Sequence, residues 1–434
     1  MNIIDIIVKK RDGGKLSREE INYFIRGCVD GSIPDYQSAA LLMAVFLRGM
    51  DEEETFFLTH AMAQSGDVLD LSNIPGIKID KHSTGGVGDK TTPVVVSIAA
   101  AAGVPVAKMS GRGLGFTGGT VDKLQSIPGF QVVLDEDRFM DQVRTVGAAV
   151  IAQSGNLTPA DKKLYALRDV TGTVENLSLI SSSIMSKKLA AGSDGIVLDV
   201  KCGDGAFMKT PEDAVKLAET MISIGRSAGK KMSAVISDMD QPLGRAVGNS
   251  VEIREAIEVL QGAGPDDVRE LCLELASEMI RLGGKAGGHQ SAMAMAREVL
   301  DSGRALEKFG EMIRAQGGDP GVIRDASLLP EGTCRTGIRA GENGFITAIR
   351  GQEIGEAARL AGAGRLRKEE DIDKTAGVIL HAKVGDHVEK GQLLAEVFGS
   401  SVEKTELAAE KCRMAFVTGS RPPAGHPLIY RVLR

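Results

Sequence analysis

The sequence lacks paired cysteines and any recognisable metal-binding motif. Its five cysteines lie far apart, and none belongs to a CxxC pair. Isolated thiols of this kind are typical of a reducing compartment, so we expect a cytoplasmic protein. The six histidines are scattered, with no HExxH motif and no Cys/His group, which argues against a zinc site.

The sequence also lacks a long apolar run and an excess of positive charge. Its longest apolar stretch, residues 93–107, is interrupted by Ser97, Gly103 and Pro105 and is too short to cross a membrane. The first ten residues have no basic segment ahead of their apolar run, so we expect no secretory signal. The formal net charge of −6 argues against a nucleic-acid partner, and any residues that bind an anion must form a local cluster.

What is present is the composition of a packed globular protein. Apolar residues make up 43% of the chain and charged residues 25%, values that exclude a disordered or fibrous protein. Because 434 residues are too many for one ordinary core, we expect two or more globular units.

The apolar pattern predicts a small all-α domain and a larger α/β domain with a mostly parallel central sheet. Capping boxes at Ser17/Glu20 and Asp51/Glu54 indicate helices in the first seventy residues. Later, short β-branched runs alternate with helical segments, which is typical of parallel strands joined by helices. The expected strands are residues 77–80, 104–109, 148–152, 195–200 and 232–236.

Two helical segments, 159–168 and 177–189, follow each other without a strand between them and could return to the first helices. We therefore expect the α domain in two pieces and the α/β domain in two pieces, followed by a C-terminal α+β module that resembles a sandwich. The expected bounds are 1–70 and 158–192 for the α domain, 71–157 and 193–335 for the α/β domain, and 336–434 for the module. Residues 384–391 resemble the hairpin of biotinyl or lipoyl domains, but no lysine lies in the usual modified position, so we interpret the module as structural.

A glycine-rich segment, residues 81–92, follows the first expected strand and precedes a helix. Backbone N–H groups in such a segment converge on an anion, and the helix N-terminus adds positive potential. Lys81, Ser83 and Thr92 add direct donors. The nucleotide P-loop does not fit, because Asp89 stands where that motif requires glycine.

A second such segment, residues 108–122, follows the next strand and offers Lys108, Ser110 and Thr120. Its spacing Gly113-x-Gly115-x-x-Gly118, with Asp135 further on, matches a dinucleotide site, but that match alone is weak. Because both segments follow neighbouring parallel strands, we expect one shared phosphate site at the carboxyl edge of the sheet.

The inserted helices carry a separate polar group. Ser183 and Lys187 are four residues apart and project from one helical face, and Arg168 lies near the end of the preceding helix. An isolated pair of this kind is more often a solvated surface. A third glycine turn, residues 199–208, fits a packing turn as well as a site.

Taken in order, these segments resemble the thymidine and pyrimidine-nucleoside phosphorylase family. The resemblance extends to about residue 397 and is most specific in residues 81–89, 110–124, 164–171, 186–189 and 199–208. It implies a homodimer, formed through the small α domain, whose two domains close over a pyrimidine nucleoside and orthophosphate. No organic cofactor and no membrane are implied.

The resemblance also implies roles for individual residues. Arg168, Ser183 and Lys187 match positions that hold the pyrimidine, and His82 matches a histidine beside the base and sugar. The catalytic group would be His82, Arg168 and Lys187. The positions that match phosphate ligands are Lys81, Ser83, Thr92, Ser110 and Thr120.

Bacterial members of the family bind a potassium ion, and a set of five positions aligns with that site: Gly88, Lys90, Leu243, Ala246 and Glu255. Lys90 stands where threonine is common, so a potassium ion there would face an ammonium group. Two further departures are Phe116, where many relatives have histidine, and Gln125, which replaces a usual glutamate.

The activity implied is reversible phosphorolysis of uridine, thymidine or deoxyuridine to the free base and (2-deoxy)-α-D-ribose 1-phosphate. We expect direct displacement with inversion, accompanied by domain closure. The alternatives are a thymidine-specific phosphorylase, a phosphoribosyltransferase of related fold, a dinucleotide-dependent oxidoreductase and a non-catalytic nucleoside- or phosphate-binding protein.

Overall fold

The computed structural model describes residues 1–113, 115–116, 118–365, 367 and 370–434, and the chain divides into two compact units. The first unit consists of residues 1–73, 153–196 and 215–232, and the second of residues 74–152, 197–214 and 233–434. Leu114 and Thr117, which belong to the second glycine-rich segment, lie outside the described residues. Residues 215–232 join the helical unit, which the sequence did not indicate.

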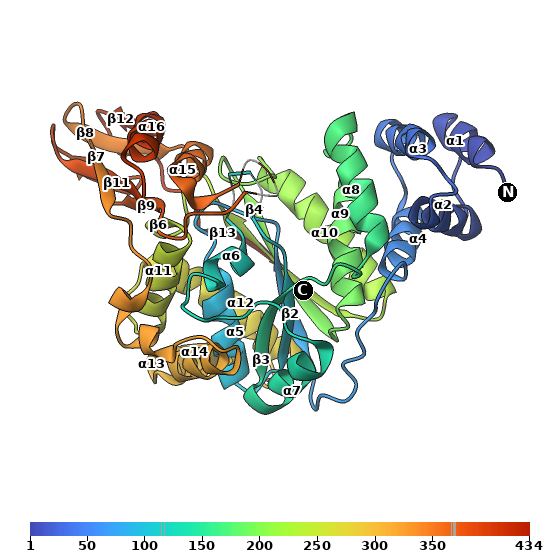
Figure 1. Ribbon diagram of the computed structural model, residues 1–434, viewed down its shortest axis with the longest axis horizontal. Coiled ribbons are helices and arrows are strands. Elements are labelled where there is room, and N and C mark those ends of the chain that lie inside the picture. The colour runs from blue at the N-terminus through green and yellow to red at the C-terminus, as the bar shows by residue number, and fades with distance from the viewer. Residues whose placement is uncertain (114, 117, 366, 368–369) are drawn as a thin grey trace. The chain divides into compact units, whose positions relative to one another are not determined.

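The first unit is built from helices, coloured blue and green in Figure 1. Ser17 and Glu20 form the expected capping box of α2, and Asp51 and Glu54 form that of α4. The inserted helices pack on the N-terminal ones, α8 on α3 and α9 on α4, around a common apolar core. The helices are α1 (Ile3–Arg11), α2 (Arg18–Asp30), α3 (Asp35–Arg48), α4 (Glu52–Ala63), α8 (Pro159–Thr171), α9 (Leu177–Ala190) and most of α10 (Pro211–Ser227).

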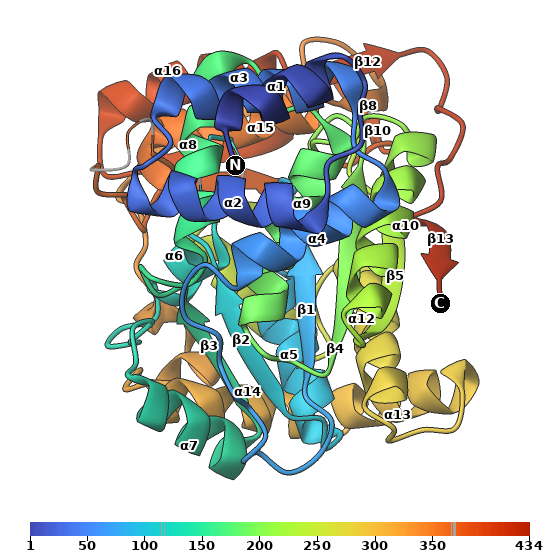
Figure 2. The same ribbon diagram turned by 90° about the vertical axis from the view of Figure 1, so that its right-hand side faces the viewer.

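The centre of the second unit is a sheet in which β1 (Ile79–Ser83), β4 (Gly195–Cys202) and β5 (Lys231–Asp238) lie in the order β1-β4-β5-β13. Strands β2 (Val106–Ser110) and β3 (Ala148–Ala152) pair in parallel, with Val106 opposite Ala148. Figure 2 shows β1 beside both β2 and β4. At the other edge, β13 (Ile429–Leu433) runs antiparallel to β5. The predicted α/β architecture is therefore confirmed.

Buried helices pack against one another in the α/β part of the second unit. The apolar run that begins at Pro93 forms α5 (Thr91–Ala101), which is buried from Thr91 to Ala100 and contacts α12 and α14. Such an all-round apolar helix belongs in a core. The other elements are α6 (Thr120–Leu124), α7 (Glu136–Val146), β6 (Ala246–Gly248), α11 (Ser250–Leu260), α12 (Asp266–Leu282), α13 (His289–Asp301), α14 (Arg304–Ala315), η1 (Pro320–Ile323) and η2 (Ala326–Leu328).

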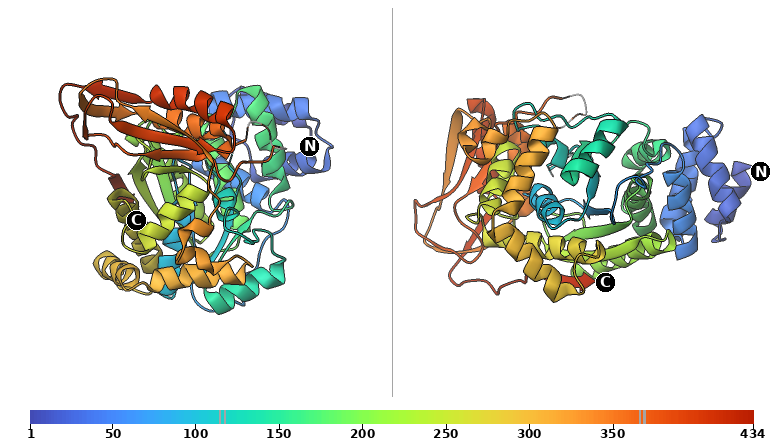
Figure 3. Two further views of the ribbon diagram at one scale, coloured as in Figure 1. Left: turned by 60° about the vertical axis from the view of Figure 1, so that its left-hand side comes forward. Right: turned by 90° about the horizontal axis from the view of Figure 1, so that it is seen from below.

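The C-terminal part of the second unit has its own apolar core and is coloured orange to red in Figure 3. Its strands form two sheets, of order β6-β9-β11-β7 and β10-β8-β12, and α16 packs on β7 and β11. The elements are β7 (Cys334–Arg339), β8 (Gly344–Ile349), α15 (Gly351–Ala358), η3 (Arg359–Ala363), β9 (Gly377–Leu380), β10 (His387–Val388), β11 (Leu393–Gly399), α16 (Val402–Arg413) and β12 (Phe416–Gly419). Because β6 comes from the α/β part, the module and that part share a sheet.

The predicted bounds of the first two strands are wrong by one to three residues. Strand β1 continues through Lys81 to Ser83, and β2 continues through Lys108 to Ser110. The predicted first strand ended at Asp80, before Lys81, whereas the predicted second strand already included Lys108 and ended one residue before Ser110. Both lysines are buried and pair with carboxylates. Among the described residues, the structure has no helix long and apolar enough to span a membrane.

Candidate active site

Lys81 is the buried centre of the first glycine-rich segment. Its Nζ lies 2.9 Å from Asp199 Oδ2 on β4 and donates a 2.6 Å hydrogen bond to Thr91 Oγ1. Burial alone lowers the pKa of Lys81, but the negative charges of Asp199 and Asp89 outweigh it, and the pKa is raised. Lys81 is therefore a protonated ammonium held beneath the β1–α5 turn, which we define as residues 84–90.

Asp89 fixes the other side of the β1–α5 turn. It accepts hydrogen bonds from Ser83 Oγ at 2.5 Å and from Thr91 Oγ1 at 2.6 Å. Burial raises the pKa of Asp89, but the charges of Lys81, Lys201 and Lys123 lower it more strongly, and the pKa lies well below the ordinary value. The turn is thus closed by a carboxylate that stays ionised, with Thr92 directly beyond it in the first turn of α5.

The second glycine-rich segment lies next to the first. Lys108 Nζ on β2 donates a hydrogen bond to the backbone oxygen of Lys81 on β1. Ser110 is the last residue of β2, and Thr120 is the first of α6. The structure therefore brings the predicted phosphate residues together in the second unit, at the ends of β1 and β2 and the starts of the helices that follow them.

Asp122 organises this second segment. It accepts hydrogen bonds from the backbone nitrogen of Gly113 at 2.8 Å, from Arg112 at 3.0 Å and from Arg365 at 2.9 and 3.0 Å. Gln125 also accepts from Arg112, at 2.6 Å, so this departure from the family pattern keeps an acceptor for Arg112.

Phe116, the other departure, is partly buried and packs against the apolar core of the C-terminal part. Its ring lies 6.4 Å from that of Phe207, in the third glycine turn. The phenyl group therefore fills this position by packing.

The predicted base-binding residues form a group in the first unit. Lys187 Nζ on α9 donates a 3.0 Å hydrogen bond to Ser183 Oγ and forms an ion pair with Asp161 of α8. Arg168 is buried, and its guanidinium donates to the backbone oxygens of Thr173, Val174 and Leu179 at 2.6 to 3.1 Å. Burial lowers the pKa of Arg168, which nevertheless remains a permanent cation.

His82 belongs to the phosphate side and not to this group. It lies on β1, is partly exposed, and stands between Lys81 and Ser83 in the second unit. The three predicted catalytic residues therefore come from both units.

The sequence did not single out the carboxylates that hold these cations. Asp161 is seven residues before Arg168, on the same face of α8, and Asp199 is two residues before Lys201, on the same face of β4. Strand periodicity could have suggested the pair of Asp199 and Lys201, whereas Asp161 pairs with Lys187 of another helix, which periodicity along α8 could not show. Asp89 was recognised only as the residue that breaks the P-loop pattern.

The predicted potassium positions surround the ammonium group of Lys90. Lys90 is fully buried, and its Nζ donates to the backbone oxygens of Leu243 at 2.8 Å and Ala246 at 2.7 Å and to the carboxylate of Glu255. Burial lowers the pKa of Lys90, but the negative charges of Glu255 and Glu252 outweigh this effect. The pKa is therefore raised, and the group is cationic. A potassium ion does not fit beside this ammonium, because two like charges would share one set of oxygen atoms.

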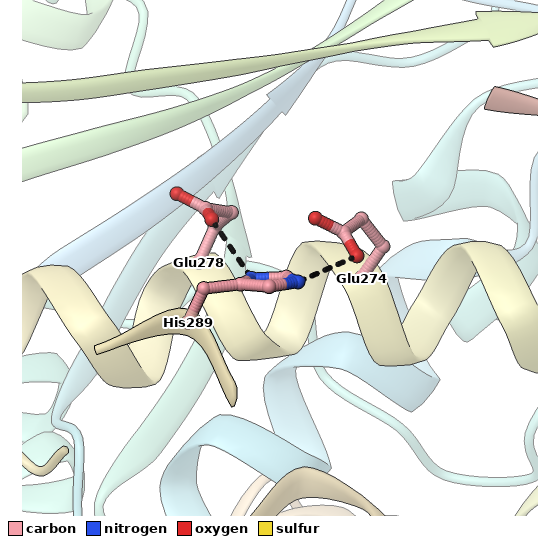
Figure 4. A group of neighbouring side chains, drawn as sticks. All are labelled: Glu274, Glu278 and His289. Atoms are coloured by element: carbon pink, nitrogen blue, oxygen red, sulfur yellow. Dashed lines mark ion pairs between the residues drawn. The ribbon is translucent and has the colours of Figure 1, made fainter. Parts of the chain in front are cut away.

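Another group resembles a metal site: Glu274 and Glu278 of α12 flank His289 of α13, as Figure 4 shows. The oxygen atoms of Glu278 already accept hydrogen bonds from Arg434 at 2.8 Å, Arg281 at 2.6 Å and Ser233 at 2.7 Å. Guanidinium groups on both sides leave little negative charge for a metal ion. We interpret the group as an ion-pair network that fastens Arg434 to α12.

Family models match three successive parts of the chain. Residues 4–66 match the helical bundle domain of a glycosyl transferase family, and residues 76–306 match the a/b domain of that family. The structure is also similar to anthranilate phosphoribosyltransferase from Thermus thermophilus, with a TM-score of 0.58, 21% identity and coverage of 71% of this chain and 98% of the other. This likeness shows the fold alone, and the family models place the chain in a class of glycosyl transferases.

Residues 345–418 match the pyrimidine nucleoside phosphorylase C-terminal domain. The chain is 54% identical to the pyrimidine-nucleoside phosphorylase of Bacillus subtilis (strain 168), over 94% of this chain and 95% of the relative. It is 55% identical to that of Staphylococcus haemolyticus (strain JCSC1435), over 92% of each chain. The chain belongs to the pyrimidine-nucleoside phosphorylase family.

Proposed function

We propose that the chain catalyses the reversible phosphorolysis of pyrimidine nucleosides, giving the free base and an α-D-pentose 1-phosphate. The observation that carries this proposal is the identity of 54–55% with pyrimidine-nucleoside phosphorylases over more than nine-tenths of the chain. The reaction requires a phosphate site and donors for the base, and the β1–α5 turn above Lys81 and the cationic group around Lys187 are candidates for these two roles.

Phosphate binds, in this proposal, where β1 and β2 end. The hydroxyl groups of Thr92, Ser110 and Thr120 and the N-terminus of α5 act as donors. The Ser83 hydroxyl joins them by turning from Asp89, to which it donates in this structure, toward the phosphate. Lys81 and Lys108 contribute positive potential from beneath, since both ammonium groups are engaged by protein oxygens in this structure. Phosphate bound in this way is the nucleophile that attacks the anomeric carbon.

The base is held by Arg168, Ser183 and Lys187. Cleavage of the N-glycosidic bond leaves negative charge on the pyrimidine, and charge-assisted donors directed at that charge stabilise the transition state. His82 supplies a further donor or a proton. No covalent intermediate on the protein is needed, so the displacement inverts the anomeric configuration.

Chemistry in this scheme requires both units to act on one nucleoside. Closure excludes water, which would otherwise hydrolyse the sugar, and brings phosphate within attack distance. The candidate hinges are residues 72–76, 155–156 and 191–193. We further propose a cytoplasmic homodimer that forms through the helical unit and accepts both uridine and thymidine; thymidine specificity is the alternative.

One assay tests the activity. Purified protein is incubated with uridine or thymidine, with and without orthophosphate, and the free base is measured. Base release that depends on phosphate supports the proposal. Release without phosphate, or a reaction that needs magnesium and pyrophosphate, would contradict it and favour hydrolysis or phosphoribosyl transfer.

A further inference from the structure

Lys90 is the last residue of the β1–α5 turn, and its ammonium group lies in a cage of oxygen atoms. Two of these atoms are backbone carbonyls, those of Leu243 and Ala246, and the third belongs to the Glu255 carboxylate. Glu255 also accepts hydrogen bonds from the backbone nitrogens of Arg245 and Ala246, at 2.9 to 3.2 Å, so the segment that carries the carbonyls is fixed.

Carbonyl and carboxylate oxygens at these positions form the kind of cage that binds a potassium ion after its water has been removed. An ammonium group carries the same charge and has a similar size. We propose that the Lys90 ammonium is a built-in replacement for a monovalent cation, and that this chain therefore needs no potassium.

The cage joins three parts of the second unit, so a positive charge at its centre acts on all three. Leu243 donates its backbone N–H to Val87 of the β1–α5 turn at 3.1 Å, and Glu255 belongs to α11. Lys383, from the C-terminal part, donates to the backbone oxygens of Pro242 and Gly244 at 2.5 and 2.7 Å. Lys90 is thus a positioning residue that anchors the end of the β1–α5 turn, two residues before Thr92.

The space around the cage is already filled. A Cβ atom at Gly88 would lie 2.5 Å from the oxygen of Leu243, and one at Gly244 would lie 2.2 Å from Glu255 and 2.9 Å from the Lys90 nitrogen. The ammonium already uses the cage oxygens, so a potassium ion would compete with it for the same atoms and enters only if the lysine side chain is removed.

The first test uses the unmodified protein in chloride salts of potassium, sodium and choline at equal ionic strength. We expect the same Tm and the same kcat/KM for phosphate in all three salts, and no potassium retained after dialysis. A protein that loses stability or activity in choline and regains it in potassium would overturn the inference.

The second test shortens the side chain. Lys90→Thr removes the ammonium and leaves an oxygen-lined space, so we expect KM for phosphate to rise about tenfold or more in choline chloride. Potassium, and sodium to a smaller extent, should restore both KM and Tm. Lys10→Thr is the matched control, because Lys10 is also a buried lysine whose ammonium pairs with the carboxylate of Glu54 at 2.7 Å outside such a cage.

The control variant should lose stability without a potassium-specific recovery. A Lys90→Thr protein that folds and gains nothing from potassium would contradict the inference. If that variant does not fold, the comparison of the unmodified protein in the three salts still tests whether the chain needs potassium. Because Tm and potassium content need no substrate, a failure of this inference is distinguishable from a failure of the proposed activity.

Discussion

At the scale of single residues, buried carboxylates hold the lysines on which the proposed site depends. Asp199 pairs with Lys81 and Lys201, each at 2.9 Å, and Asp161 pairs with Lys187. A buried ion pair of this kind contributes little net stability, but removal of one partner leaves an uncompensated charge. Changes at these aspartates should therefore affect both folding and the position of the cations.

Lys187→Met removes a charged donor from the proposed base group. We expect kcat with uridine to fall about 10²- to 10³-fold, the usual cost of losing one donor to developing charge. Lys162→Met is the control, since Lys162 is exposed on the neighbouring helix α8 and should leave kcat unchanged. Steady-state kinetics at saturating phosphate measure both, and similar kcat values for the two variants would remove Lys187 from the mechanism.

Asp89 links stability to pH. Its pKa in the folded chain lies well below the ordinary value of 3.8, so its contribution to stability is complete above that pH and is lost as the pH falls through the folded-state pKa. Asp89→Asn should lower the free energy of unfolding by about 3 to 5 kcal/mol near neutral pH. Urea unfolding at pH 7 and pH 3.5 should show a smaller difference from the unmodified protein at the lower pH; an equal difference would show that folding does not lower the pKa of Asp89.

The cysteines should differ sharply in reactivity. Burial raises the pKa of Cys28 and Cys272, and it raises the pKa of Cys202 and Cys412 to about 12, whereas Cys334 is partly exposed. Because the thiolate is the reactive form, we expect rapid modification of Cys334 by a disulfide reagent at pH 8, and of the other four after denaturation. Rapid modification of Cys202 in the native protein would contradict this arrangement.

At the scale of elements, the β1–α5 turn depends on Gly88. Its φ angle is +75°, and a Cβ there would lie 2.5 Å from the Leu243 oxygen that binds Lys90. Gly88→Ala should therefore cost about 1 to 3 kcal/mol from backbone strain alone and should raise KM for phosphate. Gly287→Ala is the control, because a Cβ at Gly287 meets open space. Thermal unfolding and phosphate kinetics test both variants. A Gly88→Ala protein with unchanged Tm and unchanged KM for phosphate would show that the turn accommodates the added methyl group.

The elements themselves were largely predictable from the sequence. Strong local signals, such as the Ser17 and Asp51 capping boxes and the apolar run of β3, correspond to the observed elements. The end of β1 was not predictable, because Lys81 continues the strand by pairing with Asp199, a carboxylate distant in sequence. The predicted end of β2 already included Lys108 and was one residue short of Ser110.

The candidate site was predictable in its residue types but not in its internal contacts. Sequence spacing grouped Ser183 with Lys187, which do form a hydrogen bond. Spacing alone could not group Lys90 with Leu243 and Glu255, which are distant in sequence; the family resemblance did so, and the structure adds the hydrogen bonds from the Lys90 ammonium.

At the scale of the whole molecule, the proposed reaction predicts a change of shape on binding. Small-angle scattering should show a smaller radius of gyration when phosphate and uracil are present together than with either alone, because the ternary complex engages residues of both units. Equal scattering curves under all three conditions would contradict closure. Scattering with phosphate and adenine is the control for a base of the wrong class.

The discontinuous helical unit also constrains how the protein can be made. Its apolar core includes Phe24 and Leu58 from the first segment but Leu164 and Leu179 from the second. On the ribosome, part of the apolar surface of the earliest helices stays exposed until about a hundred further residues have been synthesised and α8 and α9 can pack on it. Nascent chains that stall in that interval are the forms most exposed to chaperones and proteases.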